Sequence, residues 1–224
     1  HNKKGLYARI TTNPEDITAW DEEVVVTGQK CTYCHPVYLE NKERFFVFWR
    51  GETWKPTYST SKDGKKWSPA RIFIQDEGKK DKYVRPYMKI FSRGKNLIHA
   101  VFTDGHPRDE PANSLYYIKY EDGHFRNLRG EILDKNAPSS ISHKNCDVIY
   151  NANKTKIRAW VWDVSCDENN NPYVLYARFR STDKHYYHFS RWTGSEWIDA
   201  ELGFAGNWFP QTRSFRSERE PHYS

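Results

Sequence analysis

Short runs rich in aromatic and β-branched residues recur along the chain, and turn-forming residues separate them. Between Tyr83 and Tyr120 three such runs occupy residues 83–92, 96–104 and 115–120. Runs of this length and composition are typical of β-strands. The polar segment 105–114, GHPRDEPANS, is longer than a hairpin needs, and long loops on a rigid scaffold often carry binding residues. We therefore expect a substrate-binding edge at this segment; a solvated hairpin loop is the alternative.

The same pattern of four strand-like runs occurs three times, which predicts a repeat architecture. A spacing of roughly sixty residues per four-stranded unit is typical of β-propeller blades, whose sheets stack on their neighbours to bury both faces. We predict an all-β fold, a β-propeller of four-stranded antiparallel blades. The expected blades are residues 31–76, 83–133 and 157–204, with 134–153 as a linker, 1–30 and 205–224 as parts of flanking blades, and 1–224 as a single domain.

A turn before the last strand of each unit marks the repeat. Its fullest copy is residues 61–67, SKDGKKW, and residues 121–125 (EDGHF) and 193–197 (TGSEW) are degraded copies. A short acidic side chain can bond its own backbone in such a turn, glycine takes the positive φ, and the aromatic residue anchors the hairpin. We therefore interpret Asp63 as structural and not as a metal ligand.

Residues 61–67 resemble an Asp-box, or BNR, repeat of the kind found in sialidases and related propellers. Five further phrases resemble BNR-repeat-containing proteins of polysaccharide-degrading bacteria, including seven-bladed ulvan lyases and rhamnosidase-like relatives. The resemblance implies about seven blades, of which this chain would hold about three complete ones as part of a larger ring. The phrases are FTDGHPR (102–108), SLYYIKYEDGHF (114–125), AWVWDVSCDENNNPYVLY (159–176), HYYHFSRWTGSEW (185–197) and EPHYS (220–224).

Placing the chain on a propeller brings two sets of residues to one face. The first set comes from the starts of first strands, and the second from the loops that join second to third strands. Both sets are rich in histidine and arginine, which suits an anionic substrate. The substrate-binding candidates are His35, Arg50, Trp54, Arg85, Arg108, Arg178 and His222.

The resemblance to ulvan lyases also implies a reaction and three catalytic residues. Cleavage of a uronate-containing polysaccharide by β-elimination needs a donor that neutralises the carboxylate, a base and an acid. His106 in DGHPR, Tyr176 in PYVLY and Arg191 in HFSRW are the positions that look like the His, Tyr and Arg set of such lyases. Arg85 stands where these lyases can carry a second histidine, so identical chemistry is not implied.

Two other functions remain open. A glycoside hydrolase, rhamnosidase-like or sialidase-like, would release no unsaturated uronate. A non-catalytic glycan-binding propeller would show no turnover. The segment VRPY (84–87) only faintly resembles the arginine motif of sialidases.

Composition and charge limit the kinds of molecule that the protein is expected to bind. Aromatic residues make up 16% of the chain and the formal net charge is +6, which suits an anionic glycan. The sequence contains no nucleic-acid-binding motif and no stretch long enough to span a membrane. We expect a secreted, periplasmic or cell-surface location, because the resemblance implies a polymeric substrate.

The four cysteines leave three interpretations open. Cys31 and Cys34 have the spacing of half a zinc site or of a redox pair, whereas Cys146 and Cys166 lie twenty positions apart. Free buried thiols, a zinc site and a disulfide are the alternatives. No cofactor is required by the pattern; a structural zinc or calcium ion remains a candidate.

Overall fold

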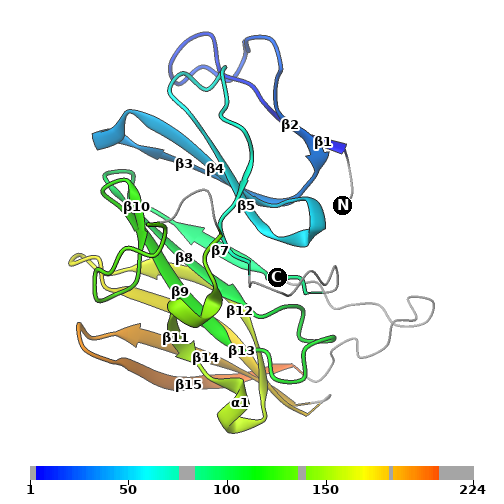
Figure 1. The fold of residues 1–224 in the computed structure, drawn as a ribbon, viewed down its shortest axis with the longest axis vertical. Helices are drawn as coiled ribbons and strands as arrows, with labels where there is room; N and C mark the ends of the chain where they lie inside the picture. The colour runs from blue at the N-terminus through cyan, green and yellow to red at the C-terminus, as the bar shows by residue number, and fades with distance from the viewer. Residues whose placement is uncertain (1–3, 76–83, 136–139, 182–183, 207–224) are drawn as a thin grey trace.

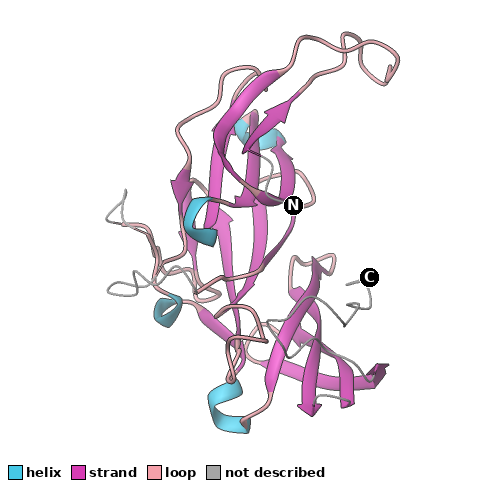
Figure 2. Cartoon of the chain, turned by 90° about the vertical axis from the view of Figure 1, so that its right-hand side faces the viewer, coloured by secondary structure: helices cyan, strands magenta, loops and turns pink. Residues whose placement is uncertain are grey.

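The computed structural model describes residues 4–75, 84–135, 140–181 and 184–206. These residues form three antiparallel sheets that follow one another along the long axis of the molecule, with a hairpin at one end (Figure 1). The prediction of an all-β fold with four-stranded antiparallel sheets is confirmed. Among the residues that the structure describes, helix is confined to single turns (Figure 2).

The first sheet has the strand order β3-β4-β5-β6. The turn after β5 is stabilised by hydrogen bonds among its own residues. At the turn after β5, Asp63 Oδ1 accepts hydrogen bonds from the backbone N–H groups of Lys65 (2.9 Å) and Lys66 (2.8 Å), and Trp67 Nε1 donates to the Gly64 carbonyl at 2.9 Å. The backbone bonds to Asp63 lower the pKa of its carboxyl to about 2. The elements are β3 (Thr32–Leu39), η1 (Glu40–Lys42), β4 (Arg44–Arg50), η2 (Glu52–Trp54), β5 (Pro56–Ser61) and β6 (Arg71–Ile72).

The second sheet has the order β10-β9-β8-β7, and a fifth strand, β11, also pairs with β9. β7 is shorter than its hydrophobic run, because Pro86 has no N–H to give to a ladder. β11 lies within residues 134–153, so the prediction of a linker there is wrong for that part. The elements are β7 (Met88–Phe91), β8 (Leu97–Thr103), β9 (Leu115–Glu121), β10 (His124–Arg126), η3 (His143–Asn145) and β11 (Asp147–Tyr150).

The third sheet has the order β12-β13-β14-β15 and the longest strands. A four-residue helix, α1 (Ala152–Thr155), leads into it from β11. Its strands are β12 (Arg158–Cys166), β13 (Pro172–Ser181), β14 (Lys184–Trp192) and β15 (Trp197–Gly206). Residues 207–224 lie outside the described part of the chain, and so does most of the final segment expected to join a flanking blade.

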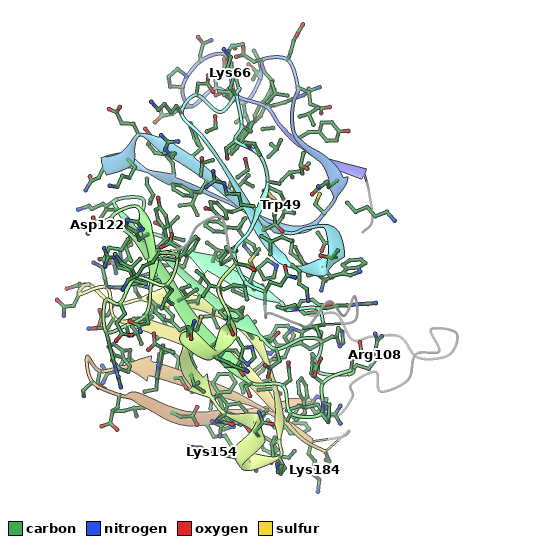
Figure 3. The ribbon with its side chains drawn as sticks, in the orientation of Figure 1. Trp49, Lys66, Arg108, Asp122, Lys154 and Lys184 are labelled. Carbon is green, nitrogen blue, oxygen red and sulfur yellow. The ribbon has the colours of Figure 1, made fainter. Side chains whose placement is uncertain are left out.

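The hairpin of β1 (Lys4–Ala8) and β2 (Val24–Lys30) forms a two-stranded sheet of its own. Val26 of the hairpin and Val47 and Trp49 of β4 form one buried cluster, against which Leu6 packs. Trp49 lies between hairpin and sheet (Figure 3). The hairpin therefore covers one face of the first sheet.

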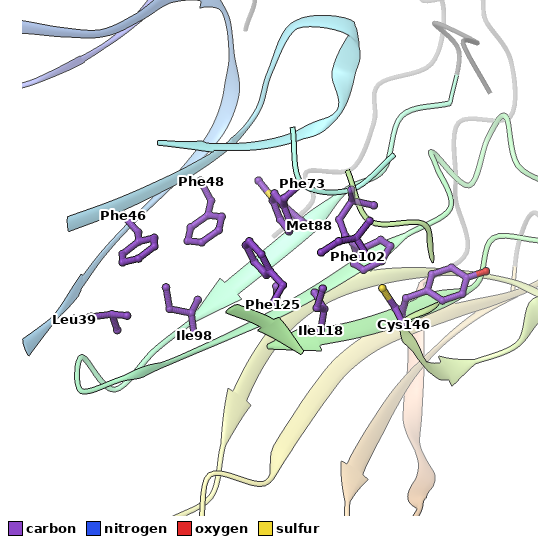
Figure 4. Close-up of a cluster of buried hydrophobic side chains, with 14 residues drawn as sticks. Leu39, Phe46, Phe48, Phe73, Met88, Ile98, Phe102, Ile118, Phe125 and Cys146 are labelled. Atoms are coloured by element: carbon purple, nitrogen blue, oxygen red, sulfur yellow. The ribbon is translucent and has the colours of Figure 1, made fainter. Parts of the chain in front are cut away.

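The other face of the first sheet packs on the second sheet. Phe46 and Phe48 from β4 point toward Ile98, Ile118 and Phe125 of the second sheet (Figure 4). All five side chains are buried, and each contributes about 1.5–3 kcal/mol by leaving water. A second cluster of buried hydrophobic residues joins the second and third sheets. The second sheet therefore packs on the first sheet through one core and on the third sheet through the other.

The four cysteines are free thiols in the structure. Cys146 and Cys166 are buried, whereas Cys34 is exposed. Within the described ranges, no helix has the length and apolar character that crossing a membrane requires.

Candidate functional site

The β4–β5 and β8–β9 connections lie at the same end of the sheets, and the β9–β10 turn lies at the opposite end. Figure 3 shows this separation directly, with Arg108 of the β8–β9 loop on the right-hand side and Asp122 of the β9–β10 turn on the left. Six residues at the first of these ends are connected by contacts to aromatic rings. We call this end the rim, and define it by Arg50, Trp54, Arg85, Tyr87, His106 and Trp160.

The β8–β9 loop, residues 104–114, is held at its base by buried polar groups. The carboxylate of Asp104 accepts hydrogen bonds from Ser114 N at 2.8 Å and from the Tyr116 hydroxyl at 2.9 Å. Asn113 is fully buried, and its Oδ1 accepts from Gly105 N at 2.9 Å. The loop is therefore not the solvated hairpin loop of the alternative interpretation.

The same loop is fastened to the third sheet. Asn113 Nδ2 donates to the carbonyl of Ala159 at 2.7 Å, and Arg158 Nη1 donates to the carbonyl of Pro107 at 2.8 Å. Buried hydrogen bonds of this kind are costly to break, because each leaves an unsatisfied group behind. The loop thus fixes the position of His106 relative to the first strand of the third sheet.

Arg50 ends β4 and is only 6% exposed. Its Cζ lies 4.2 Å from the ring centre of Tyr87, 4.8 Å from that of Trp54 and 5.1 Å from that of Tyr33. Its Nε donates to Thr32 Oγ1 at 3.3 Å, whereas its Nη1 is buried without a hydrogen-bond acceptor in the described part of the chain. A guanidinium enclosed by aromatic faces is fixed in orientation.

Arg85 brings a second guanidinium to the same place. Its Cζ lies 5.2 Å from the ring centre of Trp54, the indole that Arg50 also approaches. The Nε of Arg85 is buried and finds no acceptor among the residues that the structure describes. Trp54 is therefore close to two cations, and each of them has one buried N–H group without an acceptor among the described residues.

His106 packs edge-on between two aromatic rings. Its ring centre lies 5.4 Å from that of Tyr87 and 4.7 Å from that of Trp160. Burial, followed by the charge of Arg108, lowers the pKa of His106 to about 4. The ring is therefore neutral at pH 7. Because Nδ1 accepts from the Arg108 backbone N–H at 3.0 Å, the proton of the neutral ring is on Nε2.

Arg108 is not directed at an open ligand site. Its guanidinium makes two hydrogen bonds to the carboxylate of Asp109, both of 3.1 Å, and its side chain is 12% exposed. Its contribution to the rim is the backbone N–H that sets the proton position of His106.

His35 lies on β3, the first strand of its sheet. Burial lowers the pKa of His35, Lys89 lowers it further and Asp163 opposes the shift. Lys89 and Asp163 belong to β7 and β12, the first strands of the other two sheets, and β7 contacts both β3 and β12. The three first strands thus present polar side chains to one another, as expected for the inner strands of neighbouring blades.

Tyr176 does not join His106, contrary to expectation. In the sheet register Trp160 pairs with Ala177 and Ala177 with Tyr187, so these three share one face. Tyr176, one residue earlier, points to the other face, where it is fully buried and its hydroxyl donates to Asp199 Oδ1. Burial, the first cause, and Asp199 raise the pKa of the Tyr176 phenol.

Arg178 belongs with Tyr176 and not with the rim. Its Nη2 donates to Asp199 Oδ2 at 2.7 Å, and its Cζ lies 4.2 Å from the ring centre of Tyr150. The expectation that Arg178 faces the same ligand as Arg50 is therefore corrected. Alternation along β13 explains it, since Arg178 is two positions from Tyr176 and shares its face.

Arg191 lies at the end of β14 that is far from the rim. It pairs with Tyr173, next to the β12–β13 turn, whereas His185 pairs with Phe179 at the end near the rim. Six residues of strand separate the two positions, which is about 20 Å. Arg191 is exposed, and its placement beside His106 was wrong. His222 lies outside the described residues.

Comparison with known protein families gives a match over most of the chain. Residues 1–204 match the family described as "BNR repeat-containing family member". The chain belongs to this BNR repeat-containing family. The resemblance based on residues 61–67 and on the longer phrases is therefore confirmed. None of the curated proteins compared with this BNR-family chain matches it significantly.

Solved structures support the same fold. The chain is similar to a PL25 ulvan lyase, described as a polysaccharide lyase bound to -[GlcA(1-4)Rha3S]-, with a TM-score of 0.67 and 16% identity. The match covers 85% of this chain and 48% of the lyase chain. A second structure of such a lyase gives a TM-score of 0.66 at the same identity. The BNR-family chain thus spans about half the length of the lyase chains it matches.

The sequence pattern did not reveal several residues at or beside the rim. Tyr87 and Trp160 contact Arg50 or His106 but were assigned to strands without a role, and Tyr33, which contacts Arg50, was assigned neither a strand nor a role. Tyr187 shares the face of Trp160, and its ring lies 6.2 Å from that of Trp162. Strand alternation counted back from Trp162 would have found Trp160.

The zinc interpretation gains no support from the described residues. No group of three or more His, Cys, Asp or Glu side chains there is arranged to hold a metal ion. Cys31 and Cys34 instead flank Tyr33, which adopts a positive φ of 57° and places its ring over Arg50.

Proposed function

We propose that the rim binds an anionic polysaccharide. The observation that carries this proposal is the pair of guanidiniums, Arg50 and Arg85, whose Cζ atoms lie 4.8 Å and 5.2 Å from the ring centre of the same indole, Trp54. Carboxylate and sulfate oxygens are the natural acceptors for such groups, and aromatic faces suit the apolar faces of sugar rings. The glycan bound to the similar lyase, -[GlcA(1-4)Rha3S]-, carries both kinds of acid group.

We propose further that the bound chain is cleaved by β-elimination. A base removes the proton on C5 of the uronate, the C4–O bond breaks, a C4=C5 double bond forms and the leaving oxygen is protonated. We assign neutralisation of the carboxylate to Arg50 and Arg85. His106, with its proton on Nε2, is suited to donate a hydrogen bond to the substrate. Tyr87 lies against both His106 and Arg50, and we assign the proton transfer to it: its phenolate takes the C5 proton, and the resulting phenol gives that proton to the leaving oxygen.

We infer that the three sheets are consecutive blades of a propeller, for which the family resemblance implies seven blades. Supporting this are the adjacency of β3, β7 and β12 and the similarity to the lyase fold. A polymeric substrate also leads us to propose that the protein acts outside the cytoplasm.

The test is a product assay with a panel of uronate polysaccharides, monitored by the ultraviolet absorbance of the unsaturated uronate. We expect product from at least one substrate, and a loss of at least about a hundredfold in His106→Ala and Tyr87→Phe. Arg191→Ala is the matched control, because Arg191 is an exposed arginine at the far end of β14; its rate should stay within about twofold of the parent.

Other outcomes select the other functions. Shortened chains without unsaturated ends would indicate a glycoside hydrolase. Saturable binding that Arg50 and Arg85 control, without any cleavage, would indicate a glycan-binding domain. No binding to any uronate polysaccharide by the folded protein would remove the proposal altogether.

A further inference from the structure

We propose a second ligand site, for a sugar unit that carries a carboxylate or a sulfate, in a cavity between the first and second sheets. The cavity has a volume of about 600 Å³. This is within the range of small-molecule sites, about 300–1,000 Å³. Its walls come from β4 to β6 on one side and from the β9–β10 turn on the other. The residues on which the argument rests are Arg44, Tyr58, Arg71, Tyr120, His124 and Asp134.

The cavity is separate from the rim. Arg44 begins β4 and Arg50 ends it, so six residues of strand, about 20 Å, lie between the two sites. His124 follows the turn that contains Asp122, which Figure 3 places on the side of the molecule opposite Arg108. A ligand in this cavity therefore does not occupy the place proposed for polysaccharide cleavage.

The floor of the cavity is aromatic and belongs to the core. Phe73 and Phe125 stack with ring centres 5.0 Å apart and an angle of 9° between their planes. Tyr58 meets both rings edge-on, at 5.8 Å and 5.6 Å, and Tyr120 meets Phe125 at 5.3 Å. Because both phenylalanines are buried, the two tyrosines are held on a fixed support and the site is preformed.

Each of the two tyrosines has a guanidinium beside it. Burial raises the pKa of Tyr58, and Arg71 opposes the shift; burial likewise raises the pKa of Tyr120, and Arg44 opposes it. The two arginines come from β4 and β6 and line the same opening. Two positive charges against the single carboxylate of Asp134 leave the opening cationic, which selects an anionic ligand.

The remaining polar groups suit hydroxyls. His124 Nδ1 lies 3.2 Å from Asp134 Oδ1, and His124 is exposed at the mouth. Such a pair offers both a donor and an acceptor. A sugar ring can thus lie on the tyrosines, place an acidic group between Arg44 and Arg71, and direct hydroxyls to the His124–Asp134 pair.

Isoleucine methyl groups report on this cavity directly. Ile72 and Ile141 line it, whereas Ile198 lies exposed on β15 of the third sheet. Protein with ¹³C-labelled isoleucine methyls is titrated with methyl glucuronide and, separately, with glucose 6-sulfate; neutral methyl glucoside is the comparison ligand. We expect saturable chemical-shift changes of the Ile72 and Ile141 methyl groups and no change of the Ile198 methyl groups. The neutral sugar should change none of these signals appreciably. The anion that binds more tightly identifies the acid group.

Two variants and two controls decide the result. Arg44→Gln and Arg71→Gln should each weaken the binding by about tenfold, the effect of losing one charge-assisted hydrogen bond. Arg129→Gln, an exposed arginine outside the cavity, should have no effect. Arg85→Gln should leave these shifts unchanged while it lowers rim binding, so that failure of one site is distinguishable from failure of the other. Absence of saturable shifts, or shifts that neither cavity variant weakens, would overturn the proposal.

Discussion

The guanidinium of Arg50 lies against the ring of Tyr87, 4.2 Å from its centre, and Tyr87 in turn meets His106 edge-on. Arg50 comes from the first sheet and His106 from a loop of the second. Tyr87 therefore contacts both the guanidinium of the first sheet and the imidazole of the second.

Arg50→Lys should weaken retention on an anionic polysaccharide by about tenfold, although the charge is kept. A lysine ammonium cannot stack on three rings or pair with an acid group through a planar fork. Affinity electrophoresis in gels containing the polysaccharide measures the effect. Arg129→Lys, the same exchange at an exposed position, should migrate like the parent. Equal retention of both variants would show that Arg50 acts by charge alone.

Asn113→Ala should lower the free energy of unfolding by about 2–4 kcal/mol. The substitution removes two buried hydrogen bonds and leaves the Gly105 N–H and the Ala159 carbonyl without those partners. Urea unfolding followed by tryptophan fluorescence gives the value. Asn153→Ala, at an exposed position of α1, should change it by no more than about 0.5 kcal/mol. A neutral Asn113→Ala would mean that the loop is not held by this side chain.

Acidification should destabilise the protein through its buried histidines. The pKa of His106 is lowered to about 4 in the folded state, from an ordinary value of 6.5, by burial and by Arg108. Between pH 6.5 and 4, His106 is therefore mostly protonated in the unfolded chain and mostly neutral in the folded protein. The free energy of unfolding falls as the pH falls through this range. Between pH 7 and 5 this costs about 2 kcal/mol for His106.

The contribution of His106 can be isolated with His106→Gln, which cannot titrate. Its unfolding free energy should fall less between pH 7 and 5 than that of the parent. The remaining slope should include His99, whose pKa burial also lowers to about 4. Parallel curves for the two proteins would contradict a lowered pKa at His106.

Gly64→Ala should destabilise the fold by about 1–2 kcal/mol. Gly64 has a φ of +69°, and an added Cβ would approach Ile10 Cδ1 to 2.6 Å. Gly28→Ala is the matched control, because φ at Gly28 is not positive and a Cβ there meets no atom within 4 Å. Thermal unfolding of the pair gives the comparison, and an equal effect of both exchanges would argue against backbone strain at Gly64.

Strand pattern and turn chemistry predicted the sheets well. The run of aromatic and β-branched residues in RFFVFWR (44–50) indicated β4, and the SKDGKKW segment indicated the turn after β5, because both are determined by neighbouring residues. β11 was missed since it pairs with β9 across a long separation, and DVIY alone is too short to mark a strand.

The candidate site was predicted only in part. His106, Arg50, Trp54 and Arg85 come together because loops at one end of the sheets converge, which the topology implies. Tyr176 and Arg191 were misplaced because their positions depend on strand face and strand end, and a register shift of one residue exchanges the faces.

The anchoring of residues 104–114 has a practical consequence for engineering. Its fastening points, Asp104, Asn113 and the Pro107 carbonyl, leave the segment 108–112 between them outside these anchoring hydrogen bonds. The segment nevertheless contains the Arg108 N–H that holds the His106 ring. Any redesign of this segment should therefore keep a residue other than proline at position 108, so that the proton of His106 stays on Nε2.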